Sequence, residues 1–148
     1  MREPYTQLYV HLVWATWNRL PFLTPDRKAA VYACVKAECR KLKMEVLAIG
    51  GTEDHVHLLA GLPATSAIAT IVKQIKGSSS HLVTHTLGHL NEFKWQGAYG
   101  AFTVSKHLVP AVRSYILGQE EHHRKGTTDR DMELAWEDNL TPANKFAG

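Results

Sequence analysis

Several features that would assign this sequence to a specialised class of protein are missing. It has no run of about 18 apolar residues, so it lacks the kind of segment that spans a bilayer. The first residues, Met1 to Tyr5, do not have the charged and apolar regions of a secretory signal peptide. There is also no internal repeat and no low-complexity tract. We therefore expect a cytoplasmic globular protein without a membrane partner.

Cysteine is scarce, with 2 residues in a chain of 148. Cys34 and Cys39 lie five positions apart, a spacing that fits neither a C-x-x-C motif nor a disulfide framework. We expect both thiols to be reduced and to lie in the core. A chain of this length buries roughly 68–70% of its unfolded surface, so folding requires neither a disulfide nor a structural metal.

An excess of charge of one sign is also missing. The chain has 17 Lys and Arg against 14 Asp and Glu, a net charge of +3, which is compatible with nucleic acid but does not indicate it alone. Hydrophobic residues make up 45% and charged residues 21%, as is usual for a soluble globular protein. The length fits one domain. We expect that domain over residues 1–125, followed by a polar C-terminal tail over 126–148.

The spacing of apolar residues predicts strands that alternate with helices. We expect strands over residues 5–17, 44–50, 55–62 and 99–105, and helices over 24–43, from 65 or 66 through 83, and from about 108 to 123. The order β-α-β-β-α-β is the ferredoxin-like pattern, an α+β fold with an antiparallel sheet and two helices on one face. The third helix would then approach the other face.

Two histidines in the third predicted strand are the first candidates for a functional site. Strand alternation places His55 and His57 on one face and Val56 and Leu58 on the other. Because Val56 and Leu58 are needed against the helical layer, the histidine pair would face the third helix. Two imidazoles so spaced can share a small cation. The alternative is a hydrogen-bonded pair in a half-buried strand, since H-x-H is short and occurs by chance.

The predicted third helix carries Tyr115 and Gln119, which lie four residues apart and so on one face of a helix. A phenol that attacks an electrophile beside a metal, and an amide oxygen that completes the metal shell, require this adjacency. Taken singly, Tyr115 would be a core tyrosine and Gln119 a solvated amide. Together with a histidine pair that faces the same helix, they favour a catalytic site.

Five segments carry a family resemblance in the same order along the chain: residues 11–16, 54–59, 71–79, 95–105 and 115–124. They include His55-Val56-His57 and the Tyr115-Gln119 pair. In this ordered set the sequence resembles the HUH-type single-tyrosine transposases, the TnpA-like enzymes of simple bacterial insertion sequences. The resemblance fades after Arg124.

The resemblance implies a metal-dependent transposase that nicks and transfers single-stranded DNA with hairpin ends. His55 and His57 would bind a divalent cation, Mg²⁺ or Mn²⁺, with Gln119 as the third ligand. Tyr115 would be the catalytic nucleophile and would form a 5′-phosphotyrosine. A two-fold homodimer is also implied, in which the tyrosine helix of one subunit completes the metal site of the other. The short Lys106-His107 linker permits this arrangement and equally a site within one chain.

Further residues are candidates for supporting roles. Phosphate contacts are expected from Lys73, Lys76, Ser78, Lys106, Arg113 and Arg124, although any one lysine can equally be a solvated surface charge. His123 continues the Tyr115-Gln119 face by one turn and is a candidate substitute ligand or phosphate contact. His11 is a candidate to lie beside the pair, but we expect it instead to be a buried, hydrogen-bonded histidine.

Two other functions compete with the transposase. The first is a domesticated, non-catalytic relative that recognises nucleic-acid hairpins without cutting them. The intact set of His55, His57, Tyr115 and Gln119 weighs against it. The second is a histidine phosphoesterase, which needs a repeated H-x-[ST] motif or a third alternating histidine. Position 59 is leucine, so neither pattern is present.

Overall fold

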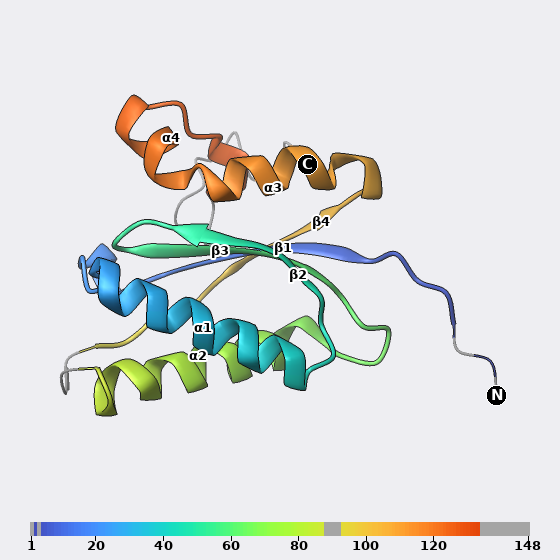
Figure 1. Ribbon diagram of the computed structural model, residues 1–148, viewed down its shortest axis with the longest axis horizontal. Helices are drawn as coiled ribbons and strands as arrows, with labels where there is room; N and C mark the ends of the chain where they lie inside the picture. The colour runs from blue at the N-terminus through green and yellow to red at the C-terminus, as the bar shows by residue number, and fades with distance from the viewer. Residues whose placement is uncertain (1, 3, 88–92, 134–148) are drawn as a thin grey trace.

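A four-stranded antiparallel sheet organises the chain in this computed structural model, which describes residues 2, 4–87 and 93–133 (Figure 1). The strands are β1 (Tyr9–Ala15), β2 (Val46–Gly51), β3 (His55–Gly61) and β4 (Gly100–Val104). They lie in the order β2-β3-β1-β4, so β1 and β3 are central and β2 and β4 are the edges. This order and the antiparallel pairing confirm the predicted ferredoxin-like α+β fold.

Helices cover both faces of the sheet. Figure 1 shows α1 (Pro25–Lys41) and α2 (Ile68–His85) on one face, and α3 (Val109–Leu117) and α4 (Gln119–Lys125) on the other. Short 3-10 turns occur at η1 (Trp17–Arg19), η2 (Lys106–Leu108) and η3 (Arg130–Met132). None of the described helices is both long enough and apolar enough to cross a membrane.

The alternation predicted for the central strands is present. The main core, between the sheet and α1 and α2, contains Leu12 and Trp14 from β1 and Val56 and Leu58 from β3. His11 and His57 are also buried, yet they belong to the opposite face, which α3 covers. Burying one large apolar side chain contributes about 1.5–3 kcal/mol, so the register that keeps the apolar set on the core side is strongly preferred.

A smaller core holds α3 against the sheet. It contains Ala48, Leu59, Val104 and Ile116, all buried. A Cβ atom on Gly50 would lie 2.1 Å from the Ile116 carbonyl oxygen. The absence of a side chain on β2 at this position therefore allows the backbone of α3 to approach the sheet closely.

The prediction of one continuous third helix was wrong. The helix ends at Leu117 and a second helix begins at Gln119, with Gly118 between them at φ −100° and ψ 18°. The Gly118 N–H donates to the carbonyl oxygens of Ser114 and Tyr115 at 3.1 and 3.3 Å. Glycine pays the largest backbone entropy cost in a helix, so the chain breaks there with little loss.

Cys34 and Cys39 are both free. Cys39 is buried in the main core and burial raises its pKa to about 11, as expected of an inert core thiol, whereas Cys34 is only half-buried, so its predicted place in the core is wrong. The helix over α2 continues through Gly77 without a break. The sequence also predicts a polar loop over residues 91–96, of which 91–92 lie outside the described residues. The division into a domain over 1–125 and a tail over 126–148 stays a prediction.

Candidate metal and nucleophile site

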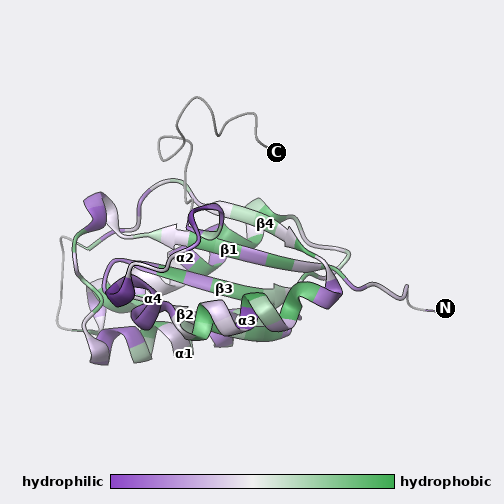
Figure 2. Cartoon of the chain, turned by 90° about the horizontal axis from the view of Figure 1, so that it is seen from above, coloured by the Kyte–Doolittle hydropathy of each residue, from purple (hydrophilic) through white to green (hydrophobic). Residues whose placement is uncertain are grey.

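The site is built on the face of β3 that α3 and α4 cover. His55 and His57 are almost fully buried, with exposed fractions of 1% and 0%, and their ring centroids lie 5.0 Å apart. Figure 2 looks onto this side of the molecule and shows a largely hydrophilic α4 beside the more apolar α3. Two buried imidazoles on one face of a strand require polar partners, because an unpaired buried polar group costs free energy.

His55 receives its first partners from the residues that precede it. Its Nδ1 lies 2.7 Å from Asp54 Oδ1 and 2.9 Å from Thr52 Oγ1. Burial acts to lower the pKa of His55, but hydrogen bonds to Asp54, Glu133 and Gln119 outweigh it and raise the pKa to about 9. A Nδ1–H that donates to a carboxylate leaves Nε2 available to a metal, as in many carboxylate–histidine–metal sites.

His57 has a different partner, a third histidine. Its Nδ1 lies 2.8 Å from His11 Nε2, and the two rings stack. Burial lowers the pKa of both groups, that of His11 to about 3, so both imidazoles are neutral at pH 7. If His57 Nδ1–H donates to His11, the Nε2 atom of His57 carries its lone pair toward the site. The placement of His11 as a buried, hydrogen-bonded histidine is the one expected from the sequence.

Tyr115 and Gln119 reach this point from opposite sides of the Gly118 break. Both side chains are buried, with exposed fractions of 8% and 1%. Gln119 Oε1 accepts a hydrogen bond from His55 Nε2 at 3.0 Å, and the Tyr115 ring centroid lies 6.1 Å from that of His57. The structure therefore brings together the four residues that were singled out from the sequence.

Glu133 is a further member of the site that the sequence analysis missed. Its Oε2 accepts hydrogen bonds from the Tyr115 hydroxyl at 2.6 Å and from Gln119 Nε2 at 3.2 Å. The backbone N–H of Asp129 donates to the same hydroxyl at 2.8 Å. The segment 129–133 thus fixes the Tyr115 hydroxyl and the orientation of the Gln119 amide.

The same carboxylate also contacts the histidines. Glu133 Oε1 lies 3.2 Å from His55 Nε2 and 2.9 Å from His123 Nε2, while Oε2 lies 3.2 Å from His57 Nε2. Burial acts to raise the pKa of Glu133, but the hydrogen bonds of the histidines hold that pKa far below its usual range. A carboxylate anion is therefore the stable form, with His55 as its cationic partner.

The pKa of Tyr115 is shifted in the opposite direction to that of Glu133. Burial, together with the hydrogen bond to Glu133, raises the pKa of Tyr115 to about 12. A phenol this weak as an acid needs a nearby cation, or the loss of its anionic neighbour, before it becomes a good nucleophile.

The donor atoms fit a divalent cation. One ligand atom each from His55, His57 and Glu133 lies within 4.8 Å of the others. His57 Nε2 is buried and makes no hydrogen bond with any described residue, although Glu133 Oε2 lies 3.2 Å away, so its lone pair is available to a cation held between the two groups. Two imidazoles with an amide and a carboxylate oxygen suit Mn²⁺ at least as well as Mg²⁺, which prefers an all-oxygen shell.

Most of the predicted phosphate contacts do not lie at this site. Lys73, Lys76 and Ser78 lie on α2, across the sheet from the histidine pair. Lys76 Nζ donates to the carbonyl oxygens of Gln96 and Ala98, and burial lowers its pKa. We conclude that the Lys76 ammonium holds the chain before β4 in place.

The remaining candidates lie at the surface. Arg124 forms an ion pair with Glu121, and Arg113 donates through Nε to the Leu47 carbonyl oxygen at 3.1 Å. Lys106 is exposed in η2, before α3. His123 lies nearer to the chemistry, since its Nε2 is 3.1 Å from Gln119 Oε1.

Sequence signals for Glu133 are weak. It lies in the region predicted as a polar tail and follows η3 after a stretch without helical periodicity. Nothing in the spacing between Gln119 and Glu133 indicates that the chain turns back onto the sheet. The one local feature is Asp129, whose side chain accepts the Asp131 N–H and starts the turn.

Comparison with known proteins gives a consistent result. Residues 4–119 match a family model described as "Transposase IS200 like". The chain is 28% identical over 120 residues to the ISDra2 transposase TnpA of Deinococcus radiodurans, covering 78% of this chain and 86% of that protein. It is 25% identical over 121 residues to the transposase for insertion sequence element IS200 of Salmonella typhimurium, covering 78% and 79% of the two chains.

Solved structures agree in fold. A crystal structure of a putative transposase from Deinococcus radiodurans has a TM-score of 0.65 and 27% identity, covering 78% of this chain and 95% of that one. The structure of a REP-associated tyrosine transposase bound to a REP hairpin has a TM-score of 0.61 and 18% identity, covering 86% and 74%. At this identity the second likeness shows the shared fold alone.

Proposed function

Because this chain belongs to the IS200-like transposase family, we propose that it cleaves and rejoins single-stranded DNA through a covalent bond to Tyr115. One observation carries the proposal. The Tyr115 hydroxyl and the Nε2 atoms of His55 and His57 all lie within 3.2 Å of one carboxylate, that of Glu133. Its two oxygens stand in for two oxygens of a scissile phosphate. That phosphate must lie against both the nucleophile and the cation that His55 and His57 would hold.

The proposed reaction is the one that the family resemblance implies. The Tyr115 oxygen attacks phosphorus and loses its proton, the bond from phosphorus to the 3′-oxygen breaks, and that oxygen gains a proton. The products are a 5′-phosphotyrosine and a free 3′-hydroxyl. Because the phosphotyrosine conserves the bond energy, a 3′-hydroxyl can later attack it and rejoin DNA without a nucleotide cofactor.

His55 and His57 would hold a divalent cation, Mn²⁺ or Mg²⁺, with Gln119 Oε1 as a third ligand and Glu133 as a further candidate ligand. A bound cation would polarise the phosphoryl oxygens and favour the phenolate form of Tyr115. Thr52, Asp54 and His11 would orient the two imidazoles through their Nδ1 atoms.

Single-stranded DNA with hairpin ends is the proposed substrate. The REP-associated tyrosine transposase of similar fold is bound to a hairpin, which supports this choice of partner. A homodimer is also part of the proposal. Within one chain, Gln119 and Tyr115 lie against His55 and His57 of that same chain, and a dimer that exchanges its tyrosine helices would rebuild the same contacts between subunits.

The test is adduct formation. Labelled single-stranded DNA from the flanks of the gene, incubated with the protein and Mn²⁺, should give a covalent complex on a denaturing gel. Tyr115→Phe, which lacks only the hydroxyl, should bind the DNA and give no adduct. Hairpin binding without any adduct in Mn²⁺ would instead support the domesticated, non-catalytic relative.

A further inference from the structure

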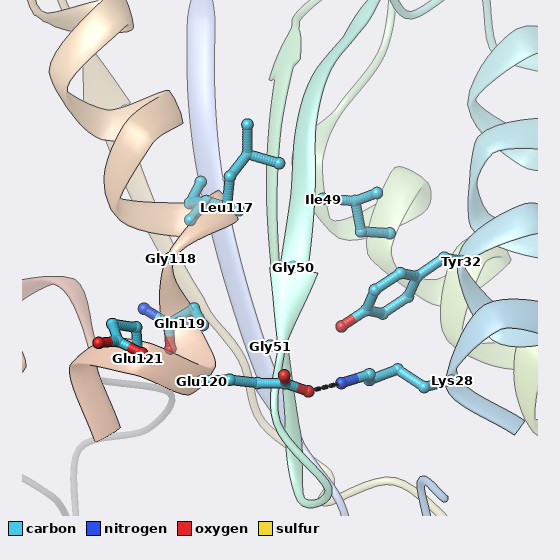
Figure 3. Close-up of a pocket in the computed structure, with 11 residues that line it drawn as sticks. Lys28, Tyr32, Ile49, Gly50, Gly51, Leu117, Gly118, Gln119, Glu120 and Glu121 are labelled. Atoms are coloured by element: carbon cyan, nitrogen blue, oxygen red, sulfur yellow. Dashed lines mark hydrogen bonds and ion pairs between the residues drawn. The ribbon is translucent and has the colours of Figure 1, made fainter. Parts of the chain in front are cut away.

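A second cavity lies beside the candidate site, between α1 and the junction of α3 and α4. Its volume is about 380 Å³, and Gln119 is one of the residues that line it. Figure 3 shows Tyr32 and Lys28 on one side, Gly118 and Glu120 on the other, and β2 between them. The cavity opens where Gly50 and Gly51 of β2 present no side chain, and Gly50 is paired in the sheet with His57, a proposed metal ligand.

The Tyr32 side chain is the unexplained group in this cavity. Its ring is half-buried, and its hydroxyl is buried without a hydrogen-bond partner among the described residues. In Figure 3 the phenol points from α1 toward the cavity and the strand. A buried donor without a partner costs free energy, so a ligand that approaches this hydroxyl would gain by pairing with it.

The charges around the cavity favour a nucleobase over a phosphate. Glu120 and Glu121 line it, against one ammonium group, that of Lys28, which is paired with Glu120. Because Lys28 is paired with Glu120, and Glu121 with Arg124 and Lys125, the residues that line the cavity offer a phosphate no unpaired cation, whereas a base is neutral and offers amino groups that carboxylates accept. An aromatic ring such as that of Tyr32 also provides a stacking surface for any base.

A basic row leads from the cavity along the edge of the sheet. On α1, Lys36 and Arg40 follow Tyr32 at four-residue intervals, so they lie on the same face of the helix. Both are exposed, and neither forms an ion pair within the described part of the chain. Lys36 and Arg113 line a further hollow of about 190 Å³ beside β2. The basic row therefore continues from Lys36 on α1 to Arg113 on α3, on either side of the edge strand β2.

We propose that the cavity binds a nucleobase adjacent to the scissile phosphate, and that Lys36, Arg40 and Arg113 contact the backbone of the same DNA strand. The proposal rests on the proposed function, because it places this strand next to Tyr115. Basic side chains also protect edge strands from pairing with other chains. If these basic residues only protected the edge strand, removing their charges would leave DNA binding unchanged.

The first experiment perturbs the DNA and leaves the protein native. Single-stranded oligonucleotides with one abasic position at a time around the cut are bound to the protein in chelator, with fluorescence anisotropy as the readout. We expect one position beside the cut to weaken binding about tenfold, the size of one lost stacking contact. Tyr32→Ala should bind intact DNA about tenfold more weakly and lose its sensitivity to that position.

Tyr32→Phe separates the ring from the hydroxyl. It should keep most of the affinity and should lose discrimination between bases at the sensitive position. If Tyr32→Ala proves unstable, the abasic series on the wild type together with Tyr32→Phe decides the case. Equal losses at every abasic position, with no dependence on Tyr32, would overturn the nucleobase site.

The second experiment measures salt dependence. Each phosphate contact on single strands contributes a slope of about −0.7 in log affinity against log salt. Lys36→Gln and Arg40→Gln should each reduce the slope by about that amount. Lys41→Gln is the matched control, since Lys41 lies on the same helix but pairs with Glu38 at 3.2 Å. Equal slopes in all three variants would refute the basic row.

The two proposals fail in distinguishable ways. If the wild type neither binds single-stranded DNA nor forms the Tyr115 adduct, the proposed function itself is wrong. If it does both, and the Tyr32, Lys36 and Arg40 variants match Lys41→Gln, only this inference is overturned.

Discussion

The Tyr115 hydroxyl donates a 2.6 Å hydrogen bond to Glu133, whose carboxylate also contacts both histidines of the pair on β3. The nucleophile and the candidate metal ligands are therefore joined through one anion. Because we propose that the scissile phosphate binds where this anion lies, DNA that reaches Tyr115 should displace this contact.

The first prediction concerns the acidity of Tyr115. Burial and the hydrogen bond to Glu133 raise its pKa to about 12. Glu133→Gln removes the negative acceptor, so the pKa should fall toward the ordinary value while the contribution of burial remains. NMR titration of ¹³C-labelled tyrosine, with Tyr115→Phe to assign the signal, measures it. Asp131→Asn, an exposed acid in the same segment, is the control and should leave the pKa unchanged.

The second prediction concerns metal affinity. Calorimetric titration of Mn²⁺ into the wild type should show one site per chain, and His57→Ala should abolish it. If Glu133 is a ligand, Glu133→Gln should weaken binding by about 10- to 100-fold, the range seen when groups that support a metal site are removed. Asp131→Asn should bind like the wild type. An unchanged affinity in Glu133→Gln would show that Glu133 only occupies the place of the phosphate.

The third prediction uses two glycines. Gly50→Ala places a Cβ atom 2.1 Å from the Ile116 carbonyl oxygen, so α3 must move away from the sheet. We expect a loss of roughly 2 kcal/mol or more in unfolding free energy, and reduced adduct formation because Tyr115 moves with α3. Gly77→Ala, which meets nothing within 4 Å in α2, should instead stabilise by about 0.5–1 kcal/mol. Urea denaturation compares the two variants.

The fourth prediction concerns pH and the metal-free protein. The pKa of His55 is raised to about 9, so its stabilisation is fully present below its unfolded pKa, about 6.5, and is lost as pH rises toward 9. The pKa of His11 is lowered to about 3, so stability also falls as pH drops below about 6.5. Unfolding free energy should peak near pH 6.5 and decline on the alkaline side by at most about 3 kcal/mol. His55→Gln should abolish the alkaline decline, and a flat wild-type profile there would contradict it.

The fifth prediction concerns assembly. His55→Ala and Tyr115→Phe, co-expressed and purified as a mixed dimer, have one good half-site each. Since Ile116 of α3 is buried against its own sheet, we expect every site to lie within one chain and the mixture to form no adduct. Adduct formation by a verified heterodimer would show that the tyrosine helices are exchanged, as the family resemblance implies.

The sequence by itself determined the layers of the fold and one side of the site. Strand alternation has a fixed period of two, so the apolar set of Val56 and Leu58 places His55 and His57 on the other face wherever β3 pairs. The pair of Tyr115 and Gln119 followed from equally local spacing. The prediction that one continuous helix carries both residues was wrong, because the helix breaks at Gly118. Both side chains nevertheless reach the histidines.

Only the tertiary structure decided what completes the site. His11 contacts His57 across 46 positions of sequence, and Glu133 reaches Tyr115 across a helix end and a turn. Neither contact has a period or a motif, because both depend on how separate elements pack and not on the local geometry of any one of them. The cavity beside Tyr32 arises in the same way, because α1 and the junction of α3 and α4 meet at the edge formed by β2, where α3 approaches closely at Gly50.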